Sequence, residues 1–244
     1  MPIEKVAVQK KERSILILFA KAPEPGEVKT RLQPLLSKEE AAALQEALIL
    51  DTLVSTRSLP VQRALACAPT IHHPFFARRR KEESLFLIEQ VGRDLGSRMK
   101  NAFKWGFAQG FEKVVLIGCD APTLPVGFIQ EAFERLDSFH VTLGPSRDGG
   151  YYLIGARPPL PDLFDGVDWG TDRVLTATLR RWNKRGEPLH LLPFWYDIDR
   201  PEDLLFLKEH LLVLERQGKP APKETRRVIR SLPFGKVSQK GGER

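Results

Sequence analysis

Three cationic side chains follow the first apolar run of the chain within eleven residues. The run ILILFA covers residues 15–20, and Lys21, Lys29 and Arg31 come after it, separated by a turn with two prolines and one glycine. A turn with little backbone freedom can hold cations and backbone N–H groups around an anion at a small ordering cost. The segment lacks the second glycine and the Gly-Lys pair of a Walker loop. It indicates either another kind of phosphate site or a solvated loop whose lysines pair with nearby glutamates.

Two aspartates stand where they could hold a metal ion. Asp120 stands just past the carboxyl end of the apolar run at 113–118, and Asp199 precedes a helical pattern that begins with Pro201. A carboxylate at the carboxyl end of a central strand can bind a hard divalent cation that bridges phosphate oxygens. Either aspartate could instead form a turn or support a helix start. Together they predict a metal site with Asp120 and Asp199 as ligands.

A glycine pair and an aromatic segment give two further candidates. Asp148 precedes Gly149-Gly150 at the start of an apolar run. Consecutive glycines let a ligand approach the backbone, although Asp-Gly-Gly is also an ordinary hairpin turn. Thr171 is a candidate N-cap for the next helix, and Trp169 is either a core residue or a surface on which a ligand ring stacks. Both are also candidates for contact with an acceptor or a sugar.

The elements that must position these residues alternate along the chain. Apolar runs predict strands near 14–20, 61–68, 85–90, 113–118, 139–144, 150–156 and 188–194. Helical patterns lie within 37–58, 99–107, 126–137, 172–184 and 201–214, and residues 72–83 are expected to form an exposed connection. This order predicts an α/β fold with a mostly parallel central sheet and helices on both faces. Ligands of such sheets bind beyond the carboxyl ends of the strands.

Composition limits the class of protein. The 244 residues favour one domain over 14–214, after an N-terminal extension of residues 1–13. Six of the seven net positive charges lie in residues 215–244, a segment rich in Gly, Pro and charge that we expect to be a largely disordered tail. No specific nucleic-acid partner is therefore expected. Without a spanning segment or a signal peptide, we expect a cytoplasmic protein with no membrane span.

The cysteine and serine residues argue against several chemistries. Cys67 and Cys119 lack His or Cys neighbours at metal-ligand spacing, so both are expected to be reduced packing residues. No G-x-S-x-G elbow and no G-x-G-x-x-G after the first strand is present, which disfavours acyl transfer and dinucleotide binding. Phosphate and metal chemistry remains.

The motifs taken together resemble a known family. FAKAPEPGEVKTRL, GRDLGSRM, VVLIGCDAPTL, GPSRDGGYYLIG, WGTDRVL and DIDRPEDL, between about residues 15 and 210, are similar to the radical-SAM-associated or arsenosugar-biosynthesis glycosyltransferases of bacteria and archaea. That family is related to phospholactate guanylyltransferase. The resemblance implies the GT-A fold of nucleotide-diphospho-sugar transferases.

The resemblance also implies roles for single residues. It implies phosphate binding by Lys21, Lys29 and Arg31, a metal site on Asp120 and Asp199, nucleotide contacts by Asp94, Arg98 and Asn101, and acceptor or sugar contacts by Asp148, Gly149 and Gly150. The chain departs from the family at Arg200, which replaces a threonine at the N-cap position of the last helix. Loss of such a cap costs about 1 kcal/mol, so the cap is in question and the metal ligand is not.

These inferences lead to one hypothesis with two versions. We expect a transferase that depends on Mg²⁺ or Mn²⁺ and uses a nucleotide sugar as donor, with Lys29, Arg31 and Asp120 as the catalytic residues and a small molecule as acceptor. The alternative is nucleotidyl transfer from an NTP to a phosphorylated acceptor, which needs the same site. A binding protein without catalysis ranks third. The base, the sugar, the acceptor and the oligomeric state stay open.

Overall fold

The computed structural model describes residues 13–83 and 85–232. The chain divides into two compact units. Unit 1 comprises Met1–Ala20, Ser58–Gly118 and Leu124–Tyr196, and unit 2 comprises Lys21–Arg57, Cys119–Thr123 and Asp197–Arg244. The predicted extension, except Arg13, and residues 233–244 of the predicted tail lie outside the described residues. The single domain over 14–214 stays a prediction.

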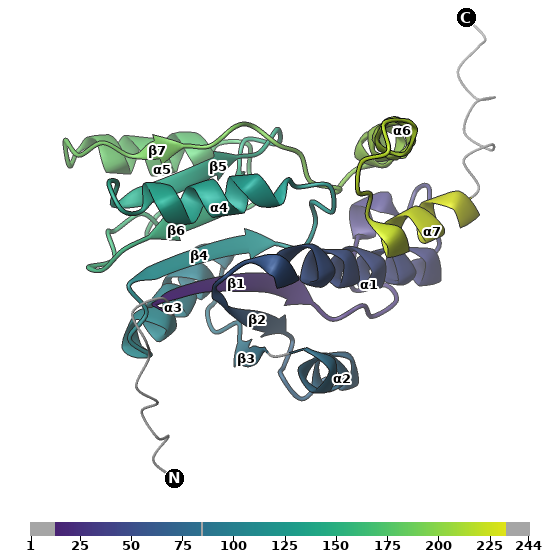
Figure 1. The fold of residues 1–244 in the computed structure, drawn as a ribbon, viewed down its shortest axis with the longest axis horizontal. Helices are drawn as coiled ribbons and strands as arrows, with labels where there is room; N and C mark the ends of the chain where they lie inside the picture. Colours follow the sequence, from purple (N-terminus) through teal and green to yellow (C-terminus); the bar gives the residue numbers. More distant parts are fainter. Residues whose placement is uncertain (1–12, 84, 233–244) are drawn as a thin grey trace, which may run out of the picture. The chain divides into compact units, whose positions relative to one another are not determined.

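Unit 1 is built on a seven-stranded sheet with the order β3-β2-β1-β4-β6-β5-β7 (Figure 1). The strands are β1 (Ser14–Lys21), β2 (Gln62–Ala68), β3 (Phe86–Glu89), β4 (Lys113–Gly118), β5 (Val141–Pro145), β6 (Tyr151–Ala156) and β7 (His190–Leu191). β1 pairs with β4, β2 with β3 and β5 with β7 in parallel, whereas β6 runs antiparallel to β4 and β5. All seven predicted strands are present, and the mostly parallel sheet is confirmed.

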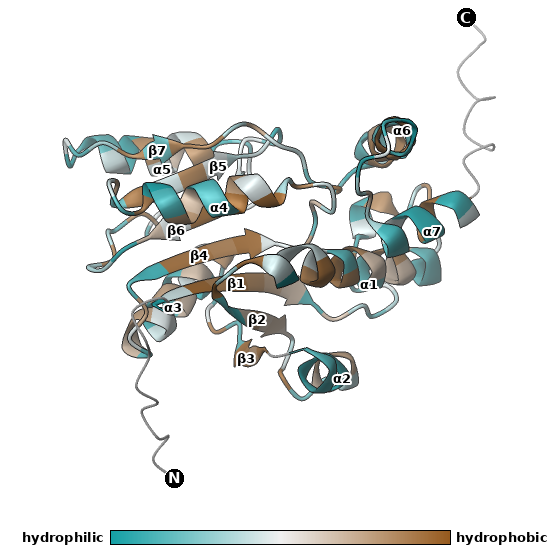
Figure 2. Ribbon diagram, viewed as in Figure 1, coloured by the Kyte–Doolittle hydropathy of each residue, from teal (hydrophilic) through white to brown (hydrophobic). Residues whose placement is uncertain are grey.

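Helices cover both faces of this sheet because its central strands are apolar on both sides (Figure 2). Unit 1 contains α2 (Pro74–Glu82), α3 (Leu95–Ala108), α4 (Val126–Arg135) and α5 (Val174–Asn183). On one face, Ile15 and Val114 join a core with Phe103 of α3 and Trp182 of α5. On the other, the backbone at Gly155 lies against Val115 and against Leu136 at the end of α4. The expectation of helices on both faces is confirmed.

The predicted exposed connection at 72–83 is wrong, because most of it forms α2. The ring of His73 accepts a hydrogen bond from the backbone N–H of Phe75 at 3.2 Å, which caps the helix start, and Phe76 is fully buried. Pro74 suits the first helical position. The helix is largely hydrophilic (Figure 2), so its composition resembles that of an exposed loop. The buried ring of Phe76 anchors it to the rest of unit 1.

Unit 2 contains α1 (Lys38–Ser55), α6 (Pro201–Arg216) and α7 (Lys223–Ser231), with the short 3-10 turn η1 (Thr30–Leu32); a second turn, η2 (Thr56–Ser58), crosses the boundary between the units. α7 lies beside α1 (Figure 1). The buried carboxylate of Asp51 in α1 accepts hydrogen bonds from the backbone N–H groups of Glu224 and Thr225 at 3.1 and 2.6 Å. Val228 and Ile229 are buried as well. The expectation of a disordered tail from residue 215 is therefore wrong as far as residue 232, because this segment docks as a capped helix.

The variant Asp51→Ala is expected to loosen α7. It leaves two backbone donors at the helix start without their acceptor, which costs about 1–2 kcal/mol of unfolding free energy. Amide hydrogen exchange should show lost protection in α7 and unchanged protection in the sheet of unit 1. The control is Glu39→Ala, an exposed carboxylate in the first turn of α1. Full protection of α7 in Asp51→Ala would mean that its apolar side chains alone hold the helix.

Within the described chain, no helix combines the length and the apolar character that crossing a bilayer requires. Cys67 and Cys119 are both buried and reduced, as expected.

Candidate functional site

Lys29 has a backbone conformation that is unusual for a lysine. With φ 47° and ψ 36° it lies in the left-handed region, and no other described residue except glycines has a positive φ. This conformation costs a side-chain-bearing residue roughly 1–2 kcal/mol. Such strain persists where surrounding contacts over-determine it, and it is concentrated at functional sites.

The contacts that hold Lys29 come from two other segments of unit 2. Its Nζ lies 2.5 Å from Oδ1 of Asp120 and 3.2 Å from Oδ1 of Asp199, and it donates a hydrogen bond to the carbonyl of Ile198 at 2.7 Å. The side chain is only 4% exposed. Three acceptors match the three protons of an ammonium group. The lysine predicted to meet phosphate is thus fully engaged between the two aspartates predicted to hold a metal.

Lys29 stays charged in this position. Burial acts to lower the pKa of its ammonium group, but the charges of Asp120 and Asp199 and their hydrogen bonds act in the opposite direction. The second effect is larger, so the pKa of Lys29 is raised above its usual value of 10.5. A buried amine kept protonated by two carboxylates is a permanent positive charge at neutral pH.

Backbone hydrogen bonds fix the two aspartates. Asp120 follows the last residue of β4 after Cys119, and its carbonyl accepts a hydrogen bond from the N–H of Ile198 at 2.9 Å. The carboxylate of Asp203 accepts from the N–H groups of Asp199 and Arg200 at 3.2 and 2.8 Å. Arg200 provides no side-chain cap, as expected, and Asp203 serves the helix start instead. The sequence signal for Asp203 is an acidic residue at the third helical position.

The other two predicted cations behave differently from each other. A guanidinium nitrogen of Arg31 lies 3.4 Å from Oδ2 of Asp199, and its side chain is 58% exposed. Lys21 instead donates to the carbonyl of Glu27 at 2.6 Å and lies 3.4 Å from its carboxylate. Arg31 therefore belongs to the cluster of Lys29, Asp120 and Asp199, whereas Lys21 bonds within its own loop. A phosphate-binding role for Lys21 stays a prediction.

The donor set of this cluster fits a divalent cation. One ammonium group contacts both Asp120 and Asp199, so the two carboxylates can meet at one small cation. Among the described residues, no group of three or more His, Cys, Asp or Glu side chains is arranged as metal ligands. Two carboxylates nevertheless suit Mg²⁺, which keeps waters and substrate phosphates in its other positions.

In unit 1, the three residues predicted to contact the nucleotide hold one loop onto the start of α3. Asp94 is the N-cap of α3, and its hydrogen bond from the N–H of Ser97 at 2.7 Å lowers the pKa of its carboxyl group. Arg98 donates to the carbonyl of Gly92 at 3.2 Å, and Asn101 donates to the carbonyl one residue earlier at 2.9 Å. Each side chain thus has a structural role, and nucleotide contact stays a prediction.

The Asp-Gly-Gly segment forms the turn of the β5–β6 hairpin. Asp148 accepts a hydrogen bond from the N–H of Gly150 at 2.9 Å. Gly149 has φ 87°, and its carbonyl accepts a hydrogen bond from the N–H of Leu175 in α5 at 2.8 Å. A Cβ at Gly149 would lie 2.1 Å from the carbonyl oxygen of Asp172. The hairpin interpretation is confirmed, and the contact with acceptor or sugar stays a prediction.

Trp169 packs among aromatic rings and against the first turn of α3. It stacks on Phe164 with ring centroids 6.3 Å apart, and it meets Tyr151 edge-on at 6.3 Å. A Cβ at Gly96 would lie 2.2 Å from the indole nitrogen, so the ring presses against the helix backbone. Of the two interpretations of Trp169, the packing role is supported.

Thr171 is not the N-cap of α5, so that prediction is wrong. The helix begins at Val174 with Arg173 as N-cap. Thr171 instead donates to the carbonyl of Asp168 at 2.8 Å and accepts from the N–H of Arg173 at 3.3 Å. These two hydrogen bonds stabilise the turn before the helix, in which Gly170 has a positive φ of 88°. Ligand contact by Thr171 stays a prediction.

Known proteins resemble the chain both in sequence and in fold. Residues 52–171 match the family described as an uncharacterized protein conserved in bacteria, DUF2064. A structure from Desulfovibrio desulfuricans, assigned as a nucleotide-diphospho-sugar transferase, is 30% identical, covers 90% of this chain and 94% of its own, and superposes with a TM-score of 0.78. No curated protein sequence matches significantly.

More distant solved structures share the fold alone. The inositol-1-phosphate CTP transferase of T. maritima is 16% identical, covers 88% of this chain and 100% of its own, and has a TM-score of 0.53. The 4-diphosphocytidyl-2C-methyl-D-erythritol synthase of Anaerococcus prevotii is 12% identical, covers 83% and 100%, and has a TM-score of 0.54. The fold class expected from the sequence is confirmed, while the radical-SAM or arsenosugar specificity is not shown. By its match to the family model and its identity with the Desulfovibrio protein, the chain belongs to the DUF2064 family and has a nucleotide-diphospho-sugar transferase-like fold.

Proposed function

We propose that this protein is a metal-dependent transferase that takes a glycosyl group from a nucleotide sugar and passes it to a small-molecule acceptor. The observation that carries the proposal is the buried, charged Lys29 between Asp120 and Asp199. Its strained backbone and its contacts from two distant segments show that the chain maintains this arrangement at a cost. The assignment of the 30% identical Desulfovibrio protein supports a nucleotide sugar as the donor.

The charge balance of the cluster explains why a metal ion belongs to the proposal. Lys29 and Arg31 carry two positive charges, and Asp120 and Asp199 carry two negative charges, so the cluster by itself is neutral. A nucleoside diphosphate is strongly anionic, and the carboxylates would repel it. A divalent cation held by Asp120 and Asp199 would make the site positive and would neutralise charge on the departing diphosphate.

The residues of the chain then have distinct tasks. When a metal ion occupies its carboxylate partners, the ammonium group of Lys29 can donate hydrogen bonds to an oxygen of the diphosphate. The exposed guanidinium group of Arg31 can bind a second phosphate oxygen. The acceptor hydroxyl oxygen forms a bond to the anomeric carbon and releases its proton to water, while the bond from that carbon to the diphosphate breaks and the bonding pair leaves with the diphosphate. The side chains of Lys29 and Arg31 stabilise the negative charge on the departing diphosphate, because both are already in place when this charge develops.

Nucleotidyl transfer needs the same residues and is the second version of the proposal. There an acceptor phosphate attacks the α-phosphorus of an NTP, and the cations stabilise the departing pyrophosphate. The fold similarity to a CTP transferase is compatible with this version, but a shared fold does not determine function. The donor must be decided by experiment.

Thermal-shift measurements with nucleotide sugars and NTPs, each with and without Mn²⁺, test the proposal. A ligand that binds only the folded protein raises its melting temperature, by about 2.7 kcal/mol of stability at 100 times its Kd. We expect a Mn²⁺-dependent shift with a UDP- or GDP-sugar. The variant Asp120→Asn should lose the metal-dependent part, while Asp165→Asn, which removes an exposed carboxylate of unit 1 paired with Lys100, should keep it.

The possible outcomes separate the versions. Shifts with NTPs alone would replace glycosyl transfer by nucleotidyl transfer. A metal-dependent shift that survives in Asp120→Asn would show that the metal site lies elsewhere. No shift with any nucleotide would contradict the proposed function as a whole.

A further inference from the structure

Helix α6 has apolar side chains on two opposite sides. Leu204, Leu207 and Leu211 are buried, with the spacing of a stripe that faces a core. A second apolar set lies on the outward side, with exposed fractions of 46, 50, 40 and 47% for Leu205, Phe206, Leu212 and Val213. A contiguous exposed apolar patch on a protein surface usually marks an interaction site.

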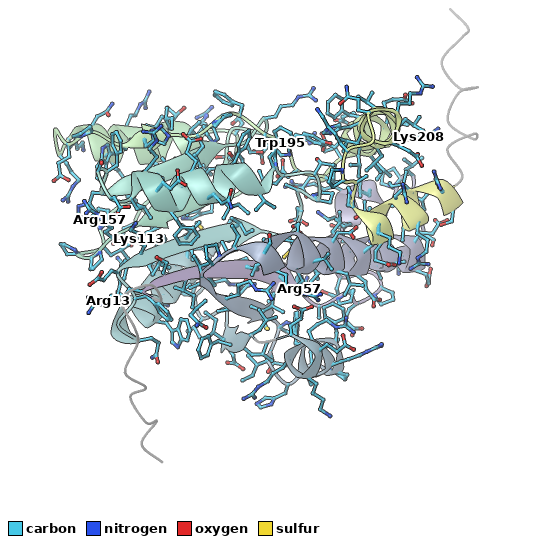
Figure 3. The ribbon with its side chains drawn as sticks, in the orientation of Figure 1. Arg13, Arg57, Lys113, Arg157, Trp195 and Lys208 are labelled. Atoms are coloured by element: carbon cyan, nitrogen blue, oxygen red, sulfur yellow. The ribbon has the colours of Figure 1, made fainter. Side chains whose placement is uncertain are left out.

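The outward side of α6 is symmetric about its middle. Glu209 is exposed at the centre, next to Lys208, which Figure 3 labels on this helix. Leu205 and Val213 lie four residues before and after Glu209, and Phe206 and Leu212 lie three before and after. Glu202 and Arg216, both exposed, lie seven before and after. We call the set of Glu202, Leu205, Phe206, Glu209, Leu212, Val213 and Arg216 the outward face of α6.

We propose that the outward face of α6 binds the same face of a second copy of this chain, with the two helices antiparallel and a two-fold axis at Glu209. A two-fold contact must be self-complementary, since the rotation reverses the order of residues along the partner helix and keeps each residue on its side of the interface. Leu205 and Leu212 lie on one side of Glu209, so Leu205 then meets the partner's Leu212. Phe206 and Val213 lie on the other side, so Phe206 meets the partner's Val213. At both ends a negative charge meets a positive one, because Glu202 lies opposite the partner's Arg216.

Electrostatics favours a second copy over an unrelated partner. The antiparallel arrangement places the positive N-terminal end of each helix dipole beside the negative C-terminal end of the other. Among the described residues, neither Glu202 nor Arg216 has an ion-pair partner within its own chain. A parallel pairing would place Glu202 against the partner's Glu202. The sign of the charges thus selects the antiparallel dimer.

The size of the face indicates a weak dimer. Four half-exposed side chains cover on the order of a few hundred Å² per chain, which lies at the low end of specific interfaces. The two Glu209 carboxylates also meet near the axis, and like charges at such a distance oppose association. A dissociation constant between about 1 μM and about 1 mM follows from these two features.

Sedimentation velocity of the full chain over this range of concentrations tests the proposal. Val213→Glu should weaken the dimer at least about tenfold, because it places a charge in an apolar contact that symmetry repeats twice. The control is Val54→Glu, a valine of unit 2 near the end of α1 that is 59% exposed, which should leave association unchanged. Glu209→Gln should strengthen the dimer about two- to fivefold by removing the central repulsion.

A charge exchange distinguishes this pairing from any other use of the face. Glu202→Arg and Arg216→Glu should each weaken the dimer, and the double variant should restore it, since the pair is remade across the interface.

Circular dichroism and melting temperatures would establish that every variant is folded. A chain that stays monomeric up to about 1 mM would overturn the proposal and leave the face to another partner. A dimer that Val213→Glu and Glu209→Gln do not alter would overturn it too. This inference is independent of the proposed function, which nucleotide binding tests separately.

Discussion

Turnover of the donor found by thermal shift is expected to fall about 100- to 1,000-fold in the variant Lys29→Met. This factor is typical for removing one preorganised donor that stabilises charge in a transition state. The loss should appear in kcat, because a group that meets developing charge contributes little to binding the ground state. Methionine is unbranched like lysine, so the left-handed backbone costs both residues a similar amount and the ammonium group is what changes.

Two further variants define what Lys29 contributes. Lys29→Arg keeps the charge but replaces a compact ammonium by a planar fork, so we expect an activity between wild type and Lys29→Met. Lys38→Met removes an exposed lysine from the first turn of α1 in the same unit, and it should leave turnover unchanged. Activity of Lys29→Met within about threefold of wild type would assign Lys29 a purely structural role.

The same variant should change the response to metal. Without the ammonium group, Asp120 and Asp199 face each other with no cation between them, so a divalent cation gains both carboxylates without displacing Lys29. Mn²⁺ alone should therefore raise the melting temperature of Lys29→Met more than that of wild type. An equal rise in both proteins would mean that Mn²⁺ binds away from these aspartates.

The variant Gly149→Ala is expected to lose about 3 kcal/mol of unfolding free energy. Its φ of 87° costs a residue with a Cβ roughly 1–2 kcal/mol. The new Cβ would also lie 2.1 Å from the carbonyl oxygen of Asp172, a backbone atom in the turn before α5 that cannot rotate away. Such overpacking adds about 1–3 kcal/mol. For a chain of this length the melting temperature should fall by about 2–4 °C per kcal/mol.

Gly170→Ala is the matched control for Gly149→Ala. It has nearly the same φ, 88°, and no atom lies within 4 Å of its new Cβ, so it should show the backbone cost alone. Urea denaturation followed by tryptophan fluorescence suits the comparison, because all four tryptophans belong to unit 1. Equal losses in the two variants would contradict the close contact between the hairpin turn and α5.

The strands could be predicted because their signal is local. Runs such as ILILFA and VVLIG are apolar at every position, and only a strand buried on both faces tolerates this. Leu16 and Leu18, on the face opposite Ile15 and Ile17, are indeed fully buried. The five predicted helices have the same kind of signal with a longer period.

The missed helices depend on contacts that composition does not reveal. α2 is charged along most of its length, and its stability rests on the cap by His73 and on the buried ring of Phe76. α7 depends on Asp51, which lies more than 170 residues earlier in the chain. No window of sequence around residue 225 contains that carboxylate, so the segment resembles a solvated tail.

The candidate site divides in the same way. The sequence by itself determined that a cationic loop follows β1, that Asp120 lies just beyond β4 and that Asp199 precedes α6, because strand ends and helix starts follow from local pattern. Only the tertiary structure decided which charges pair: Lys29 bonds to Asp199 across 170 residues, while Lys21, eight residues from Lys29, bonds to Glu27 instead. The physical reason is that an ion pair depends on the distance in space between two charged atoms, and a left-handed Lys29 points its side chain where only the folded unit 2 provides carboxylates.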